Sequence, residues 1–185
     1  MNKNKYSSMR LVWIDLEMTG LNDNKCVILE VAMIISDINL IKLDSICLVI
    51  WQPESYLENM IPIVRDMHTK NGLLDKVRTS SISLDQAQTK LMEILVKHVQ
   101  FKRGILAGNS VHIDRRFLHK HMPVIDNYLH YRHLDVSSIK ILIENWLWNG
   151  IKPHKKSTLH TAMCDIEQSL DELKFYKKHC LSKNK

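Results

Sequence analysis

The chain has 185 residues, of which 45% are hydrophobic and 25% charged, and its 26 Lys and Arg against 20 Asp and Glu give a formal net charge of +6. This length can bury a sizeable core, and only 5 Gly and 4 Pro exclude collagen-like and low-complexity disordered chains. No apolar stretch reaches the roughly 18 residues of a membrane span, and no signal-peptide core follows the basic start. We therefore expect a soluble, cytoplasmic protein.

The sequence predicts one domain with two short basic ends. Neither an internal repeat nor a Pro/Gly/Ser-rich linker divides the chain. We expect a flexible N-terminus over 1–9, a single domain over 10–180 and a C-terminal tail over 181–185. The 4 cysteines are far apart in sequence and form no C-x-x-C pair, which favours reduced thiols over a zinc site or a redox pair.

Three strands are predicted in the first part of the chain. Segments 11–14, 27–35 and 46–51 are rich in apolar and β-branched residues, and they follow one another closely. Consecutive strands of this kind indicate an antiparallel meander at the start of the domain.

The rest of the chain alternates between strand and helix patterns. The helices have apolar residues at helical spacing, and Ser83 and Gln86 form a capping box before the first of them. Ser137 or Ser138 is expected to cap a later helix. The predicted elements are, in chain order, a helix over 84–99, a strand over 105–107, a helix around 117–122 that ends before Pro123, a strand over 131–134, a helix around 139–146 and a helix over 162–177. This order predicts an α/β fold, a mixed β-sheet flanked by α-helices.

The first predicted strand runs into two acidic residues, Asp15 and Glu17. Because side chains alternate along a strand, both carboxylates would project from the same face, about 6.6 Å apart. Burying two like charges raises their pKa or destabilises the fold, and bound cations would resolve the conflict. The alternative is that the strand has already ended, with both acids on a solvated loop beside Gly20, and this fragment alone does not decide between the two.

Three later residues have both a structural and a functional interpretation. Asp114 stands at the head of a helix, where an acid is expected as an N-cap whatever its function. Asp165 lies beside the apolar stripe of the last helix, where it could be a boundary acid paired with a lysine. His160 lies about 140° around a helix from Asp165, so it belongs to the preceding loop or first turn, as a mobile general base or a surface histidine. Taken singly, each residue favours the structural interpretation.

Taken together, the four acids and His160 favour a catalytic site. An oxygen-rich set of ligands suits Mg²⁺ or Mn²⁺ rather than zinc. Two such ions about 3.5 to 4 Å apart can flank a scissile phosphate, one activating water and the other stabilising the leaving oxygen. The set therefore indicates phosphodiester hydrolysis. A zinc site built from His119 and His121, or from His130 and His133, is a poor alternative because no cysteine or carboxylate completes it at the usual spacing.

Four motifs contain these residues and occur in order between residues 10 and 180. They are Trp-Ile-Asp-Leu-Glu-Met-Thr-Gly-Leu over 13–21, Gly-Asn-Ser at 108–110 followed by Asp-Arg-Arg-Phe-Leu at 114–118, Tyr-Arg-x-Leu-Asp-Val-Ser over 131–137, and His-x-Ala-x-x-Asp over 160–165. They resemble the oligoribonucleases, which belong to the histidine subtype of the DEDD exonuclease superfamily. The resemblance implies a ribonuclease-H-like fold, a homodimer, and 3′-to-5′ removal of nucleoside 5′-monophosphates from very short RNA, especially dinucleotides.

The resemblance also implies a role for each residue of the set. Asp15 would bridge two divalent ions, and Glu17 and Asp165 would complete the ligands of one of them. Asp114 would support the other ion, partly through water. His160 would take the proton from the attacking water.

Contacts with the substrate are implied by the same resemblance. Ser110, Arg132 and Ser137 match a cap on the 5′ phosphate, and the arginine offers a bidentate fork for it. The structural alternatives are a surface ion pair for Arg132 and a helix N-cap for Ser137, which could also serve both purposes. Leu21 and Tyr131 match positions that hold bases, with Tyr131 reaching the site across the dimer.

One segment departs from the family pattern. Where an aromatic wedge is expected a few residues before His68, the sequence has Ile63 within an otherwise non-aromatic segment over 61–67. This difference predicts a stacking clamp that is weaker or built differently. His68 itself matches a substrate-side position, and an ordinary surface histidine is the alternative.

The positive charge is concentrated at the two ends of the chain. Residues 1–10 carry +3 and residues 174–185 carry +5, which leaves residues 11–173 at −2. This distribution favours a very short nucleic-acid substrate over a long basic track. The alternatives are another exonuclease of the superfamily that acts on longer RNA or DNA 3′ ends, or a non-catalytic nucleic-acid-binding or protein-binding module.

Overall fold

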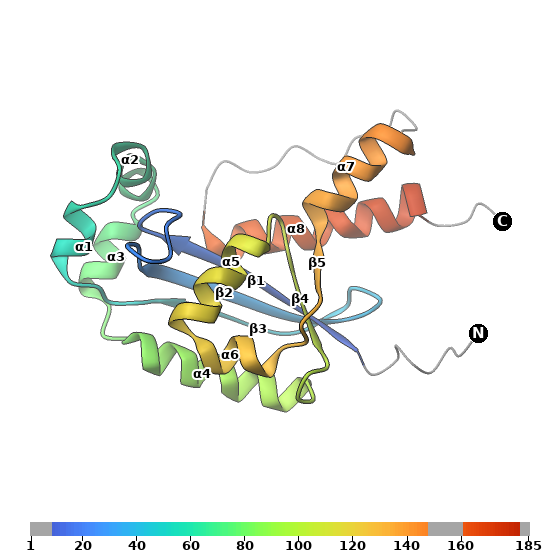
Figure 1. Cartoon of the computed structure of the whole chain (residues 1–185), viewed down its shortest axis with the longest axis horizontal. Coiled ribbons are helices and arrows are strands. Elements are labelled where there is room, and N and C mark those ends of the chain that lie inside the picture. The colour runs from blue at the N-terminus through green and yellow to red at the C-terminus, as the bar shows by residue number, and fades with distance from the viewer. Residues whose placement is uncertain (1–8, 148–160, 182–185) are drawn as a thin grey trace.

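The computed structural model describes residues 9–147 and 161–181. It contains a five-stranded mixed sheet in the order β3-β2-β1-β4-β5, in which the first three strands form an antiparallel meander and the last two join in parallel (Figure 1). The strands are β1 (Arg10–Met18), β2 (Ile28–Asp37), β3 (Lys42–Val49), β4 (Gly104–Gly108) and β5 (His133–Asp135). The predicted meander and the predicted mixed sheet flanked by helices are both confirmed.

Helices cover both faces of this sheet, and Figure 1 shows α4 and α8 on opposite sides of it. The helices are α1 (Glu54–Glu58), α2 (Pro62–Lys70), α3 (Leu73–Thr79), α4 (Leu84–His98), α5 (His112–His121), α6 (Pro123–Tyr128), α7 (Val136–Trp146) and α8 (Ala162–Tyr176), which continues as a π-helical turn over Lys177–Leu181. None of the described helices is long and apolar enough to cross a membrane.

The alternation of side chains along β1 divides the core in two. Val12 and Ile14 pack with α4, α5 and α6 on one face, whereas Leu11 and Trp13 pack with α7 and α8 on the other. Because the period of a strand is two residues, the positions after Trp13 on the α8 face are Asp15 and Glu17. The fold therefore directs both carboxylates toward the beginning of α8.

Several predicted boundaries hold and others shift. The capping box of α4 is present, since the Gln86 amide donates to Ser83 Oγ at 3.2 Å and the Ser83 amide donates to Gln86 Oε1 at 2.9 Å. The third and fifth strands, predicted over 46–51 and 131–134, lie over Lys42–Val49 and His133–Asp135. The prediction that Ser137 or Ser138 caps α7 was wrong, because Asp135 occupies the N-cap and accepts from the Ser137 amide at 2.9 Å.

The segment between β3 and α4 contains the helices α1, α2 and α3, which the sequence patterns did not predict. Each is nine residues or shorter, too short for a clear helical period. They bury a separate apolar cluster against Leu29 of β2, made of Leu57, Met60, Leu73, Leu74 and Val77. Val64 of α2 packs against this cluster, and His68 of α2 bonds to Met18 O, so α2 lies beside the end of β1.

Candidate active site

Three carboxylates meet where β1 passes the first turn of α8. β1 continues through Glu17 to Met18, so the alternative that Asp15 and Glu17 lie on a solvated loop was wrong. One ligand atom from each of Asp15, Glu17 and Asp165 lies within 4.8 Å of the other two. Within residues 9–147 and 161–181, no other group of three or more His, Cys, Asp or Glu side chains could hold a metal ion in this way.

Asp165 reaches this cluster because of how α8 packs. Ile166 and Leu170 on the helix are buried against the sheet, as the apolar stripe predicted. Asp165 precedes Ile166 in the first turn, and its amide donates to Thr161 O at 3.0 Å. The helix therefore presents a carboxylate to β1 from its N-terminal end, where the helix dipole favours negative charge.

Asp114 joins the cluster through the backbone of β1. The N-cap of α5 is Val111, without a side-chain capping bond, so the prediction that Asp114 is the N-cap was wrong. Instead Asp114 Oδ1 accepts from the amide of Leu16, the residue between the two acids of β1, at 3.0 Å. Burial raises the pKa of Asp114 to about 7, and this bond from Leu16 opposes the rise.

The electrostatics of the cluster are unfavourable without a cation. Burial is the main cause that raises the pKa of Glu17 to about 8, and repulsion from Asp165, Glu30 and Asp114 adds to it. The pKa of Asp15 is raised well above its usual range, mainly by burial and then by repulsion from Asp114 and Glu17. Oxygen ligands that repel one another in a buried site fit a hard divalent cation such as Mg²⁺ or Mn²⁺.

The two predicted histidines have different outcomes. His160 lies outside the described residues. His68 on α2 is fully buried, so the alternative of an ordinary surface histidine was wrong. Burial lowers its pKa, its Nε2–H donates to Met18 O at 3.0 Å, and its Nδ1 lies 3.9 Å from Glu17 Oε2. Its observed contacts are with the end of β1, and its contact with substrate stays a prediction.

The residues predicted to cap a 5′ phosphate are only partly brought together. Ser110 has a left-handed φ of 50°, and its hydroxyl lies 3.4 Å from that of Ser137. The Ser110 amide also donates to Asp135 Oδ1 at 3.0 Å. Arg132 precedes the 3-residue strand β5 and Ser137 follows it, so the two residues are separated by the length of that strand, roughly 10 Å. The Arg132 guanidinium lies 5.3 Å from the centre of the Tyr131 ring.

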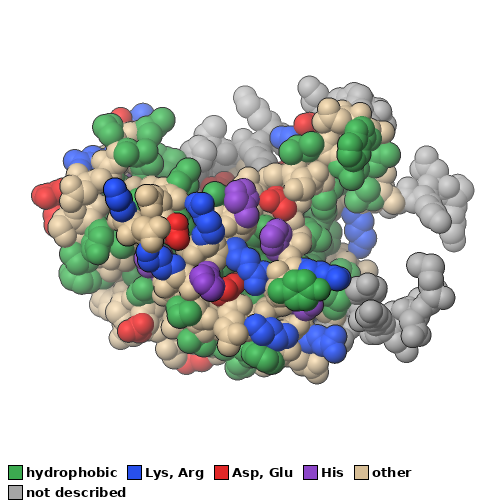
Figure 2. Space-filling model, viewed as in Figure 1, with side chains coloured by type: hydrophobic (Ala, Val, Ile, Leu, Met, Phe, Trp, Pro, Cys, Tyr) green, Lys and Arg blue, Asp and Glu red, His purple; other side chains and the backbone are tan. Residues whose placement is uncertain are grey.

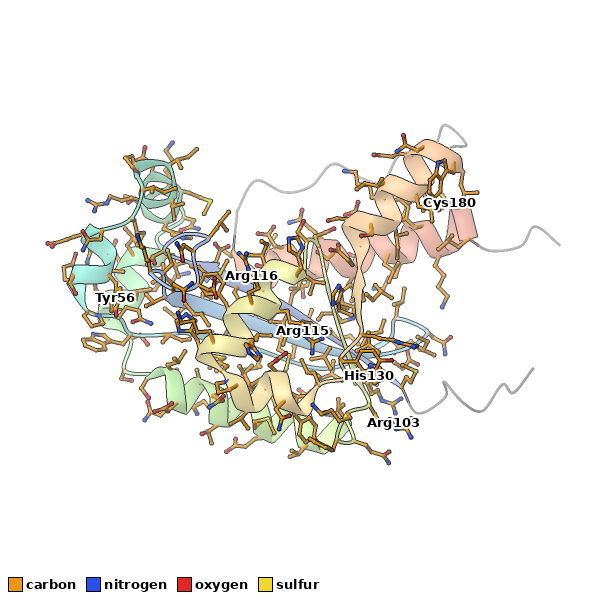
Figure 3. The ribbon with its side chains drawn as sticks, viewed as in Figure 1. Tyr56, Arg103, Arg115, Arg116, His130 and Cys180 are labelled. Carbon is orange, nitrogen blue, oxygen red and sulfur yellow. The ribbon has the colours of Figure 1, made fainter. Side chains whose placement is uncertain are left out.

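A pocket beside Leu21 is lined by an aromatic side chain, Tyr56, that the sequence patterns did not identify as a site residue. Figure 3 labels this residue, Tyr56, on α1. Tyr56 and Ile61 line the pocket together with Leu21, whereas Ile63 is 75% exposed and is not among its lining residues. Arg116 of α5 donates to the Leu21 carbonyl at 3.0 Å and so fixes the loop on which Leu21 lies (Figure 3).

Two further features could not be identified from sequence patterns. Glu30 is a buried acid on β2, directly opposite Glu17 in the register of the two strands. Lys, Arg and His side chains also gather over α5 in Figure 2, where the exposed residues of this helix are His112, Arg116, His119 and Lys120. The near-neutral body of the chain is therefore divided into an acidic cluster and a basic surface.

Comparisons with known proteins agree with this geometry. A family model described as exonuclease matches residues 12–173. The chain is 44% identical over 177 residues to an oligoribonuclease of Francisella tularensis subsp. holarctica, covering 95% of this chain and 98% of that protein. It is 41% identical over 172 residues to an oligoribonuclease of Chromobacterium violaceum, covering 92% and 95% of the two chains.

Solved structures show the same fold at low sequence identity. Exonuclease I from Methylocaldum szegediense superposes with a TM-score of 0.71 at 14% identity. E. coli exonuclease I in complex with a dT13 oligonucleotide superposes with a TM-score of 0.72 at 13% identity. Each match covers 92% of this chain but only 41% of the other, so the chain spans about two fifths of those exonucleases. The family model and the identity to full-length relatives show that the chain belongs to the oligoribonuclease family of exonucleases.

Proposed function

We propose that the protein is a 3′-to-5′ exoribonuclease that hydrolyses very short RNA, especially dinucleotides, to nucleoside 5′-monophosphates. The observation that carries this proposal is the cluster of Asp15, Glu17 and Asp165, with Asp114 beside it, in a member of the oligoribonuclease family. Such a site suits phosphodiester hydrolysis with divalent cations. We further propose that residues 10–180 act as one catalytic domain in the cytoplasm, where the 4 free cysteines would stay reduced.

The acidic residues would divide two cations between them. Asp15, Glu17 and Asp165 would hold one, and Asp15 with Asp114 would hold a second, partly through water. Bound Mg²⁺ or Mn²⁺ would supply charge to activate water and to stabilise the leaving oxygen. His160 would take the proton of the attacking water as general base. The bond from phosphorus to the 3′ oxygen then breaks, and the last nucleotide leaves with its phosphate on the 5′ oxygen.

Substrate length would be set on the 5′ side of the scissile bond. The hydroxyls of Ser110 and Ser137 lie close enough to share one phosphate oxygen. The negative Asp135 beside them would repel a phosphate, and Arg132 would supply the positive charge that offsets this repulsion. The bases would pack on Leu21, with Tyr56 as the aromatic wall that Ile63 does not provide. A two-base substrate depends strongly on such stacking, worth about 1 to 3 kcal/mol for each base.

We also propose that the protein is a homodimer in which the partner's Tyr131 reaches the site. In one chain the Tyr131 side chain is 71% exposed and stacks on His130. The outer side of α7 is also apolar and exposed at Ile141 and Trp146. Sedimentation equilibrium should give twice the chain mass, and Tyr131→Ala should lower dinucleotide turnover. A monomer with full activity would contradict the dimer.

The central experiment offers 5′-labelled RNA of two and of about twenty nucleotides to the purified protein, with Mn²⁺ or with EDTA. We expect faster turnover of the dinucleotide and no turnover with EDTA. Asp15→Asn should abolish turnover, whereas the matched control Asp171→Asn, at an exposed position on α8, should not. Equal or faster turnover of the long RNA would reject the preference for short substrates, and activity in EDTA would reject the role of metal.

A further inference from the structure

Glu30 is a buried acid that the proposed mechanism does not use. It lies in β2, where all residues from Ile28 to Ser36 are buried, and its side chain is only 5% exposed. Its partner across the strand pair is Glu17, and like charges directly opposite each other destabilise a sheet. A carboxylate buried in such a place is costly unless it is well hydrogen-bonded. Its position therefore calls for a compensating contact.

The compensating contact is with the start of α8. Glu30 Oε2 accepts from the amide of Ala162 at 2.9 Å, and this hydrogen bond is buried. Ala162 is the first residue of α8, and the N-cap, Thr161, makes no side-chain capping bond. The first amides of a helix have no partner within the helix, and the positive end of the helix dipole favours a carboxylate. Glu30 thus supplies, from a neighbouring strand, the cap that the helix lacks locally.

This bond lies directly behind the acidic cluster. Asp165 is three residues after Ala162, within the same first turn of α8. Fixing Ala162 against β2 therefore also fixes the position of Asp165 along and above β1. The ligand that α8 contributes to the cluster is therefore tied to β2 through this one amide.

We propose that Glu30 is a positioning residue for the metal site. Its carboxylate holds the first turn of α8 on the sheet, so that Asp165 stands at ligand distance from Asp15 and Glu17 before a cation binds. The role belongs to the acceptor oxygen and not to the negative charge, which repels the other acids. This inference rests on the proposed metal-dependent function, and it concerns a residue outside the cluster of Asp15, Glu17 and Asp165.

Two substitutions at Glu30 separate the acceptor from the charge. Glu30→Ala removes both, whereas Glu30→Gln keeps an acceptor oxygen of the same reach. Mn²⁺ binding is measured by isothermal titration calorimetry, and kcat and KM are measured with a dinucleotide. We expect Glu30→Ala to weaken Mn²⁺ binding and lower kcat by about 10- to 100-fold with little change in KM, as is typical for residues that orient metal ligands. Glu30→Gln should stay close to the wild type in all three.

Ala162→Pro tests the same bond from the helix side. Proline is well tolerated at the first position of a helix but has no amide to donate, and Thr161 before it already has the extended backbone, φ −125° and ψ 143°, that proline requires. This variant should reproduce the loss in Glu30→Ala, and the double variant should lose no more than either alone. The matched control is Glu167→Gln, an exposed acid on the same helix that pairs with Lys42.

Three results would overturn the proposal. They are unchanged Mn²⁺ binding and kcat in Glu30→Ala, an equal loss in Glu30→Gln and Glu30→Ala, or losses that add in the double variant. Circular dichroism checks that each variant folds, and if Glu30→Ala does not, Glu30→Gln against Ala162→Pro still decides. If the wild type binds Mn²⁺ but cleaves no RNA, the proposed function fails while the Mn²⁺ comparison still tests Glu30.

Discussion

Replacing Glu17 with glutamine should stabilise the metal-free protein at alkaline pH while removing its metal site. In the folded chain Glu17 is buried beside three other acids, which raises its pKa from 4.5 to about 8. In the unfolded chain the same carboxyl ionises freely. Folding must therefore hold a proton on Glu17, at a cost that rises with pH up to about 8, and above that pH it buries the charge at a constant cost.

The sign and the size of this effect follow from proton linkage. Below pH 4.5 Glu17 is protonated in both states and contributes nothing to stability. Between pH 4.5 and about 8 only the unfolded state loses the proton, so the folded state becomes progressively less favoured. For these two pKa values the destabilisation is about 1 kcal/mol at pH 5 and about 4 kcal/mol at pH 8. Glutamine does not ionise, so Glu17→Gln should gain about 3 kcal/mol over the wild type between the two pH values.

Urea unfolding followed by circular dichroism measures this difference at pH 5 and pH 8 in EDTA. Glu167→Gln is the control, because its exposed carboxyl should give the same small difference from the wild type at both pH values. With saturating Mn²⁺ at pH 8 the order should reverse, since a ligand that binds only the folded state stabilises it and the variant lacks a ligand atom. An advantage of Glu17→Gln in EDTA that is the same at both pH values would refute the reasoning.

Three further substitutions test other parts of the site. His160→Ala should lower kcat by about 10²- to 10⁴-fold and leave Mn²⁺ binding intact, and an unchanged kcat would remove this residue from the chemistry. Tyr56→Ala should raise the dinucleotide KM by roughly 5- to 150-fold if a base stacks there, whereas Tyr56→Leu, which keeps apolar bulk, should recover only part of it. An unaltered KM would mean that the base packs elsewhere. Arg116→Ala should raise KM through its lost bond to the Leu21 carbonyl, and an effect on kcat alone would argue against that loop as a binding element.

Local sequence patterns were sufficient wherever the interactions themselves are local. The capping box of α4 joins residues three positions apart, and the alternation in β1 placed Asp15 and Glu17 on one face of the sheet. The apolar stripe of α8 likewise predicted which side packs on the sheet. In each case the neighbours in the sequence are also the neighbours in space, so composition and spacing carry the necessary information.

Other features depend on contacts between distant segments. Asp114 looked like a helix cap, and its bond to the Leu16 amide exists only because α5 packs beside β1. The sequence left His68 as either a substrate-side residue or a surface histidine, whereas it is fully buried and bonds to Met18 O, 50 positions earlier in the chain. Glu30 carried no signal beyond a charge in an apolar strand, since its partner amide is 132 positions later in the chain. Such bonds require the tertiary arrangement, which no local window contains.

The net charge of the chain is another property that is misleading without the tertiary arrangement. It was the basis for favouring a very short substrate over a long one. Residues 11–173 sum to −2, which by itself speaks against a phosphate track. Five of the negative charges in that sum lie in or behind the site, on Asp15, Glu17, Glu30, Asp114 and Asp165. Without those five, the remainder of the segment would carry +3, and part of it forms the basic surface over α5 in Figure 2. Net charge therefore does not determine substrate length in this chain. We propose that Ser110, Ser137 and Arg132 determine it on the 5′ side, and RNA length series test this more directly than salt dependence does.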